Sequence, residues 1–164
     1  MKHLEIERKF LIKMPNKAEL EAFPQVRVAE ITQTYTTLGI RLRKWTENGQ
    51  TKYIQTVKKH ITNVTRTEEE GEISKEEYNA LLKFAATDRI VLQKTRYSLP
   101  YEGKIVEVDV FPFWTNQAFL EVELTDEEEE IRIPDFLCVI KEVTDDLSYR
   151  NYSLTKKIPK EENF

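Results

Sequence analysis

Cysteine, histidine and long apolar runs are scarce in this chain of 164 residues. The single cysteine, Cys138, has no partner for an internal disulfide, and its apolar neighbours predict a buried, unreactive thiol. His3 and His60 are too far apart in sequence to indicate a zinc site, and we expect them to be structural or solvated. No apolar run reaches membrane-spanning length, and no signal-peptide core follows Met1. These absences predict a cytoplasmic protein with no membrane partner.

Charge is abundant and nearly balanced. Lysine and arginine number 25, aspartate and glutamate number 29, and the formal net charge is -4. The slight acidic excess argues against nucleic acid as a partner. The length suits one domain over residues 1–164, with a disordered tail after about residue 158. The distribution of the charges is therefore more informative than their sum.

The first strand-like stretch has one ionic face. Side chains alternate across a β-strand, so Glu5, Glu7 and Lys9 share a face while Ile6 and Phe10 point the other way. Taken alone, such a strand is more often a solvated surface than a binding site, because charged residues are mostly exposed. Recurrence of the pattern decides between these two interpretations.

The same alternation recurs along the chain. Strands are predicted near residues 26–35, 40–43, 52–58, 90–98, 104–111 and 118–125. Asn48-Gly49 predicts a tight hairpin, and the Ser74-x-x-Glu77 capping box begins a predicted helix over residues 74–86. Shorter helices are expected over residues 135–140 and 149–157. The paired ionic residues on the later strands are Arg41 and Arg43, Lys94 and Arg96, Glu107 and Asp109, and Glu121 and Glu123.

A closed antiparallel barrel with an ionic interior accounts for all these faces together. We therefore predict a mainly β fold of the α+β type, with a few flanking helices. The aliphatic outer faces would then need cover from the Ser74 helix, from the C-terminal segments, or from a second copy in a homodimer.

The interior chemistry points to a phosphate chain with a divalent metal. Carboxylates without nearby histidine or cysteine suit hard cations such as Mg²⁺ or Mn²⁺. Arginine and lysine pairs on strands suit a polyanion, because guanidinium groups grip phosphate in a bidentate manner. Only a metal-bound phosphate chain needs both halves of such an interior.

The motifs, taken in order, resemble those of the CYTH-domain proteins, the triphosphate tunnel metalloenzymes. The resemblance runs from residue 3 to about residue 157. Its elements are Glu5-Ile6-Glu7-Arg8-Lys9, Gln33-Thr34-Tyr35, Arg41-Leu42-Arg43, Thr56-Val57-Lys58, Arg66-Thr67-Glu68-Glu69-Glu70, Lys94-Thr95-Arg96, Glu107-Val108-Asp109, Glu121-Val122-Glu123, Val143-Thr144 and Tyr149-Arg150-Asn151.

The resemblance implies an eight-stranded antiparallel β-barrel that forms a tunnel for a triphosphate and Mg²⁺ or Mn²⁺. The implied metal ligands are Glu5, Glu7, Asp109, Glu121 and Glu123. The implied substrate-binding residues are Lys9, Arg41, Arg43, Lys58, Arg66, Lys94 and Arg96. The implied catalytic residues are Glu5, Glu7, Lys9 and Glu123. The family has a further tunnel lysine near its C-terminus, and three residues of this chain are candidates for it: Lys141, Lys156 and Lys157.

Three functions fit these residues. The first is metal-dependent hydrolysis of a small-molecule triphosphate, preferably inorganic tripolyphosphate, because the matched elements all serve phosphate. The second is a class IV-type adenylate cyclase, which would convert ATP to cyclic AMP and pyrophosphate. The third is a module that binds polyphosphate or nucleotide without turnover, and the full acidic set disfavours it.

Overall fold

The computed structural model describes residues 2–62 and 64–162, and it leaves undescribed the side chains of residues 2–5, 58–60 and 66. Strands predominate in it, and the helical segments are short. The elements in chain order are β1 (Lys2–Lys13), α1 (Lys17–Ala22), β2 (Arg27–Tyr35), β3 (Arg41–Glu47), β4 (Gln50–His60), β5 (Thr65–Ile73), α2 (Lys75–Leu82), β6 (Leu92–Tyr101), β7 (Lys104–Val110), β8 (Gln117–Leu124), β9 (Val139–Glu142), η1 (Leu147–Tyr149) and α3 (Asn151–Leu154).

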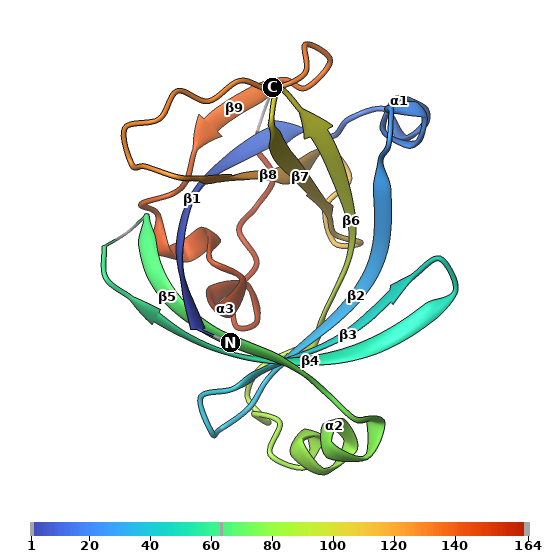
Figure 1. The fold of residues 1–164 in the computed structure, drawn as a ribbon, viewed down its shortest axis with the longest axis vertical. Helices are drawn as coiled ribbons and strands as arrows, with labels where there is room; N and C mark the ends of the chain where they lie inside the picture. Colours follow the sequence, from blue (N-terminus) through green and yellow to red (C-terminus); the bar gives the residue numbers. More distant parts are fainter. Residues whose placement is uncertain (1, 63, 163–164) are drawn as a thin grey trace.

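The strands form one antiparallel sheet in the order β5-β4-β3-β2-β6-β7-β8-β1-β9, and β5 pairs again with β1. This additional pairing joins the first half of β1 to β5, while the second half of β1 pairs with β9. Figure 1 looks along the resulting ring of strands. The predicted mainly β fold, an antiparallel barrel of eight strands with flanking helices, is confirmed, and β9 is a ninth, short strand beside β1.

The β3–β4 hairpin turns at the predicted Asn-Gly pair. Asn48 and Gly49 have φ angles of 53° and 74°, the positive values that a type I′ turn requires at both central positions. Glu47 pairs with Gln50 directly across this two-residue loop. The turn thereby sets the register of β3 against β4, and with it the face on which Arg41 and Arg43 lie.

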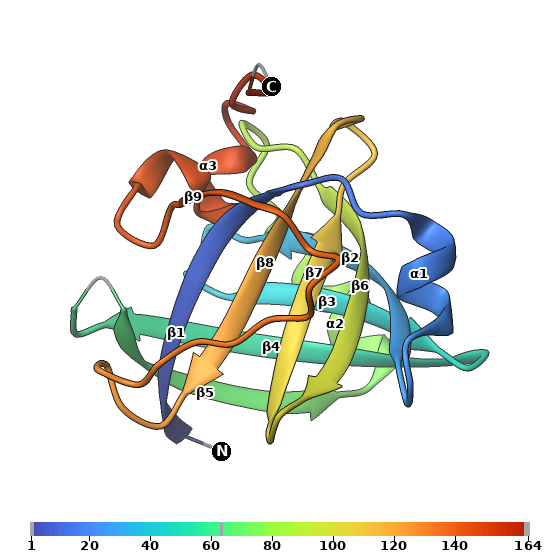
Figure 2. The same ribbon diagram turned by 90° about the horizontal axis from the view of Figure 1, so that it is seen from above.

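The aliphatic outer faces of β6, β7 and β8 are covered by the chain itself. Leu20 of α1 and Leu137 of the link between β8 and β9 are buried in one apolar cluster with Val106, Leu120 and Val122. Figure 2 shows α1 and the orange link on the outside of the strands. Cover by a C-terminal segment was predicted, whereas the part played by α1 was not.

The predicted Ser74 helix covers a different part of the barrel. Its capping box is present, with the Ser74 hydroxyl accepting from the Glu77 N–H and the Glu77 carboxylate accepting from the Ser74 N–H. The helix ends at Leu82 rather than at residue 86. Its Tyr78 ring packs 4.7 Å from that of Tyr53 on β4, so α2 lies against β3 and β4.

The predicted helix over residues 135–140 is wrong. A turn closes with the Leu137 N–H donating to the Pro134 carbonyl, and β9 then pairs with β1. A short apolar run does not distinguish a helix from a strand, and the free backbone edge of β1 decided the outcome. The prediction of a buried Cys138 is also wrong: along this extended segment Leu137 faces the core and Cys138 is exposed.

The C-terminal residues form two short helical pieces, η1 and α3, in place of one helix over residues 149–157. An aromatic cluster of Phe111, Trp114, Phe119 and Tyr149 packs them against the barrel. Residues 159–162 contact the rest of the chain, since the Trp114 indole donates to the Pro159 carbonyl; the disordered tail after about residue 158 stays a prediction. Among the described residues, no helix is both long enough and apolar enough to cross a membrane.

Candidate active site

Cationic side chains from three strands point into the barrel. Lys9 lies on β1, Arg41 and Arg43 on β3, and Lys94 and Arg96 on β6, and all five side chains are buried. The backbone positions of Lys58 and Arg66 pair with Glu68 and Glu5, but the side chains of Glu5, Lys58 and Arg66 lie outside the described residues. The interior is thus densely cationic.

Arg43 has no carboxylate partner among the described residues. Its Nε donates to Gln33 Oε1 at 2.8 Å. Burial lowers the pKa of Arg43 to about 9, and the neighbouring cations Arg41 and Arg96 add to the effect. A buried guanidinium without a counterion is costly, so this position favours binding of an anion.

Lys94 and Arg96 are held by Asp109 instead. Lys94 donates to one carboxylate oxygen at 2.8 Å, and Arg96 donates to both oxygens at 2.8 and 2.9 Å. Burial would raise the pKa of Asp109, but Arg96 and Lys94 outweigh it and hold that pKa well below its usual range. Burial lowers the pKa of Lys94 to about 7 although Asp109 opposes the shift. Asp109, a predicted metal ligand, is therefore engaged by two cations in this geometry.

Four carboxylates lie together on the inner face of β1, β7 and β8. The register places Glu7 opposite Glu123 and Glu107 opposite Glu121. Burial raises the pKa of Glu107 to about 7; Arg96 lowers it, and the carboxylates of Glu121, Asp109 and Glu7 raise it. Like charges directly opposite one another destabilise a sheet. Arg96 pairs with Glu107 at 3.1 Å and Lys9 lies 3.7 Å from Glu121, and a bound cation would relieve the repulsion that remains.

The donor set fits a hard divalent metal. All four side chains offer oxygen, the ligand that Mg²⁺ and Mn²⁺ prefer. Among the described residues, no three acidic, histidine or cysteine side chains already converge as a metal site. The fit therefore rests on the opposed carboxylate pairs and on the raised pKa of Glu107.

A cavity of about 860 Å³ extends into one end of this interior. It opens beside α3, where Figure 1 shows that helix at the mouth of the barrel. Glu7 lines it from the acidic side, and Lys9 and Arg41 line it from the cationic side. A linear polyanion with a bound cation could contact both halves from this cavity.

Lys9 connects this cavity to the C-terminal segment. Its ammonium lies 2.9 Å from the Tyr149 carbonyl, 3.7 Å from the Glu121 carboxylate and 4.0 Å from the centre of the Phe119 ring. Its backbone N–H donates to the Thr144 hydroxyl at 2.8 Å. The C-terminal segment of the chain thereby helps to position Lys9 of β1.

Several residues at the cavity were not among the predicted site residues. Tyr35, Arg89, Arg150 and Tyr152 line it, and the Arg89 guanidinium lies 3.5 Å from the centre of the Tyr152 ring. Only the resemblance indicated Tyr35 and Arg150, and no sequence pattern indicated Arg89 or Tyr152. Of the competing late lysines, Lys156 lines the mouth and pairs with Asp88 at 2.8 Å, while Lys141 pairs with Glu162 at 2.6 Å.

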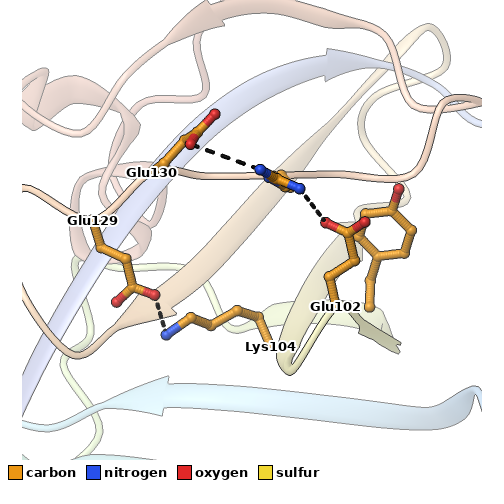
Figure 3. Close-up of a pocket in the computed structure, with 6 residues that line it drawn as sticks. Glu102, Lys104, Glu129 and Glu130 are labelled. Carbon is orange, nitrogen blue, oxygen red and sulfur yellow. Dashed lines mark ion pairs between the residues drawn. The ribbon is translucent and has the colours of Figure 1, made fainter.

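A second hollow, of about 370 Å³, lies on the outer surface at the β6–β7 hairpin. Figure 3 shows that its charged side chains pair with one another: Lys104 with Glu129, and Arg132 with Glu102 and Glu130. All its charged side chains already form ion pairs with one another, so this hollow has no counterpart of Arg43, which is buried without a carboxylate partner among the described residues.

Comparison with known proteins agrees with this geometry. The sequence pattern of the CYTH domain matches residues 3–137. The chain is 35% identical, over 120 residues and 72% of each protein, to an inorganic triphosphatase of Acetivibrio thermocellus. The solved structure of the inorganic triphosphatase NE1496 is 29% identical, with a TM-score of 0.58 over 95% of this chain and 97% of that one.

A more distant solved structure shares the fold. The PH1819 protein of Pyrococcus horikoshii is 23% identical, with a TM-score of 0.51 over 76% of this chain and 80% of that one. The motifs read in order, the closed antiparallel barrel and the match over most of the length all lead to one assignment. The chain belongs to the CYTH domain family.

Proposed function

We propose that this protein hydrolyses a phosphoanhydride bond of a small-molecule triphosphate, with inorganic tripolyphosphate preferred, in a metal-dependent reaction. The observation that carries the proposal is one cavity lined by the carboxylate of Glu7 and by the buried cations Lys9 and Arg41. Arg43, on the same face of β3 as Arg41, is buried without a carboxylate partner among the described residues. The similarity to two inorganic triphosphatases supports it.

The cations would bind and orient the phosphate chain. Lys9 and Arg41 line the cavity, and Arg43 lies beside Arg41 on the same face of β3. Their positive charge stabilises the charge that develops on the leaving phosphate oxygen. The remaining members of the proposed substrate-binding set are Lys58, Arg66, Lys94 and Arg96.

The carboxylates would hold the metal and accept a proton. Glu7, Glu121 and Glu123 are the proposed ligands, with Glu5 and Asp109 completing the set expected from the sequence. A bound Mg²⁺ or Mn²⁺ would neutralise phosphate charge. Water attacks the terminal phosphorus, the bridging P–O bond breaks, pyrophosphate leaves, and a tunnel carboxylate takes the proton of the water. The proposed catalytic residues are Glu5, Glu7, Lys9 and Glu123.

The test incubates the protein separately with tripolyphosphate, ATP and thiamine triphosphate, each with Mg²⁺, with Mn²⁺ or with EDTA, and resolves the products by ion chromatography. Metal-dependent release of phosphate and pyrophosphate from tripolyphosphate is expected. Cyclic AMP from ATP would instead identify a cyclase, and binding without products would identify a non-catalytic module.

Substitution of one carboxylate tests the metal assignment. Glu123→Gln should abolish metal-dependent turnover, because an amide binds a hard cation more weakly than a carboxylate does. Glu127→Gln, in the exposed acidic run after β8, is the matched control and should keep wild-type activity. Full activity in Glu123→Gln would refute the assignment.

The other expected properties stay predictions. A homodimer would bury apolar residues of the outer face, and light scattering on the purified protein tests it. A cytoplasmic location and the lack of a nucleic-acid partner rest on composition.

A further inference from the structure

Both backbone polar groups of Lys9 bond to the chain segment that follows β9. The Lys9 N–H donates to the Thr144 hydroxyl at 2.8 Å, and the Lys9 carbonyl accepts from the Val143 N–H at 2.9 Å. The β1–β9 ladder ends at the pair of Phe10 with Glu142. The Thr144 side chain therefore supplies the acceptor that a longer strand would have offered to the Lys9 N–H.

The Thr144 hydroxyl is fixed in turn by an ion pair on the outside of β1. Its single proton has a close acceptor in Glu142 Oε2 at 2.7 Å, while the Lys9 carbonyl lies farther away, at 3.3 Å. The Glu142 carboxylate accepts two bonds from the Arg8 guanidinium, at 2.8 and 2.6 Å. A hydroxyl that donates to Glu142 presents its oxygen to the Lys9 N–H, so the four residues form one hydrogen-bonded chain.

The pair of Arg8 and Glu142 is ionic, bidentate and partly exposed. The hydrogen bonds from Arg8 hold the pKa of Glu142 below its ordinary value, although burial opposes the shift. Two parallel bonds between a guanidinium and a carboxylate fix the orientation of both groups. The side chains are 31% and 36% exposed, and pairs with such exposure contribute little to stability. An orienting role therefore accounts for the geometry better than a stabilising one.

The ammonium of Lys9 is held by the same segment. Its Nζ donates to the carbonyl of Tyr149 in η1, farther along the chain from Thr144, at 2.9 Å. The Lys9 side chain thus begins at a backbone bonded to this segment and ends at a carbonyl of the same segment. A shift of the segment would move the ammonium within the cavity that Lys9 lines.

We propose that Glu142 and Thr144 are positioning residues for Lys9, and that Arg8 holds Glu142 in place from the outer face of the barrel. The inference rests on the proposed triphosphate hydrolysis, in which Lys9 contacts the phosphate chain. It gives a role to Arg8, the charged member of an outer face that it shares with the apolar Ile6 and Phe10. An ion pair on the outer surface thereby sets the position of a lysine inside the barrel.

The first test removes the carboxylate. Glu142→Ala should lower kcat/KM for tripolyphosphate about tenfold, because a displaced ammonium aligns the phosphate chain less well. Glu129→Ala is the matched control and should keep the wild-type kcat/KM. On the outer surface, Glu129 likewise joins a cation, Lys104 (Figure 3), to a threonine hydroxyl, that of Thr125 at 2.7 Å. Urea denaturation of both variants separates a loss of activity from a loss of stability, and equal kcat/KM in the two would overturn the proposal.

The second test asks whether Glu142 acts through Thr144. Thr144→Val keeps the shape of the side chain without its hydroxyl and should lower kcat/KM as much as Glu142→Ala does, whereas Thr144→Ser should recover most of the activity. Adding Glu142→Ala to Thr144→Val should then change kcat/KM by less than about twofold, because the chain is already broken. Full additivity of the two substitutions would contradict a shared route to Lys9.

Amide hydrogen exchange keeps the proposal testable if tripolyphosphate is not the substrate. In protein labelled with ¹⁵N-lysine, the Lys9 N–H signal is the one missing from the spectrum of Lys9→Arg. Its exchange should be about tenfold faster in Glu142→Ala, the equivalent of one weakened hydrogen bond, and unchanged in Glu129→Ala. Unchanged exchange in Glu142→Ala would overturn the positioning role whatever the protein hydrolyses. Faster exchange in a protein that hydrolyses no triphosphate would refute the proposed function and leave the positioning of Lys9 standing.

Discussion

Buried cations in this barrel are neutralised in two different ways. Lys94 and Arg96 share Asp109, whereas Arg43 has only the neutral Gln33 as a hydrogen-bond partner among the described residues. The first arrangement is complete without a ligand, and the second is completed by an anion. Binding of an incoming phosphate should therefore depend more on Arg43 than on the β6 pair, because Arg41 on β3 already has Glu68 as an ion-pair partner at 3.7 Å.

Replacing Asp109 should destabilise the fold strongly. Asp109→Asn leaves Lys94, which is 2% exposed, without its carboxylate partner and leaves Arg96 with Glu107 alone, at a cost of about 3–5 kcal/mol in the free energy of unfolding. Urea denaturation followed by tryptophan fluorescence measures it. Asp88→Asn, which breaks the exposed pair with Lys156, is the control and should leave the midpoint in place. Similar midpoints for the two variants would contradict this interpretation.

Glu107 should make the stability of the metal-free protein depend on pH. Its folded-state pKa of about 7 lies above the ordinary value of 4.5, because of burial and the neighbouring carboxylates of Glu121, Asp109 and Glu7, which outweigh Arg96. Between these two values the folded state binds more protons than the unfolded state, so stability falls as the pH rises from about 4.5 to 7.

The measurement is urea denaturation in EDTA at pH 5 and pH 7.5, for the wild type and Glu107→Gln. The decline in the free energy of unfolding should be smaller in the variant, because its amide does not titrate. An equal decline in both proteins would show that Glu107 keeps its proton affinity unchanged on folding.

At the scale of the elements, the alternation of charged and aliphatic residues along the sequence predicted the strands well. Residues 104–111 and 118–125 were expected as strands, and β7 and β8 occupy nearly the same positions. The alternation is strong because one face is ionic and the other aliphatic, so a slip of one residue would bury the wrong set. Helices too short for such a pattern were harder to predict from the sequence. The helix α1 was not predicted, because it has only six residues after its Asn16 cap.

The capping box of α2 should contribute to stability but not to catalysis. Ser74→Ala removes the acceptor for the Glu77 N–H and should lower the free energy of unfolding by about 1 kcal/mol. The activity towards tripolyphosphate should not change, because α2 packs on β3 and β4 outside the barrel. Thermal denaturation and the phosphate-release assay test both parts, with Ser74→Thr as the variant that restores the cap. A loss of activity at temperatures where Ser74→Ala is folded would show a link between α2 and the cavity.

For the whole molecule, the site was less predictable than the fold. The charge pattern indicated which side chains share the interior, but not which of them neutralise one another. Asp109 and Glu123 were both predicted metal ligands, yet Asp109 is buried against two cations and Glu123 is exposed. Such differences arise from pairing across strands distant in sequence, which a local pattern does not contain.

Binding of a ligand across the barrel should stabilise the whole domain. At 100 times its Kd, a ligand that binds only the folded state adds about 2.7 kcal/mol, which for a domain of this size raises Tm by about 5–10 °C. Tripolyphosphate in EDTA, which prevents turnover, should show this effect in a thermal shift assay. Orthophosphate at the same ionic strength is the control, and an equal shift with it would indicate a general salt effect.

The position of β1 in the sheet has a consequence for synthesis on the ribosome. This strand is made before its partners β5, β8 and β9, which end at residues 73, 124 and 142. Until those segments emerge, the nascent chain carries an unpaired strand edge with an ionic face, a template for wrong pairing with other chains. The strand that supplies Glu7 and Lys9 is thus translated before all its partners and is fully paired only after residue 142, and slow translation before that residue should increase aggregation.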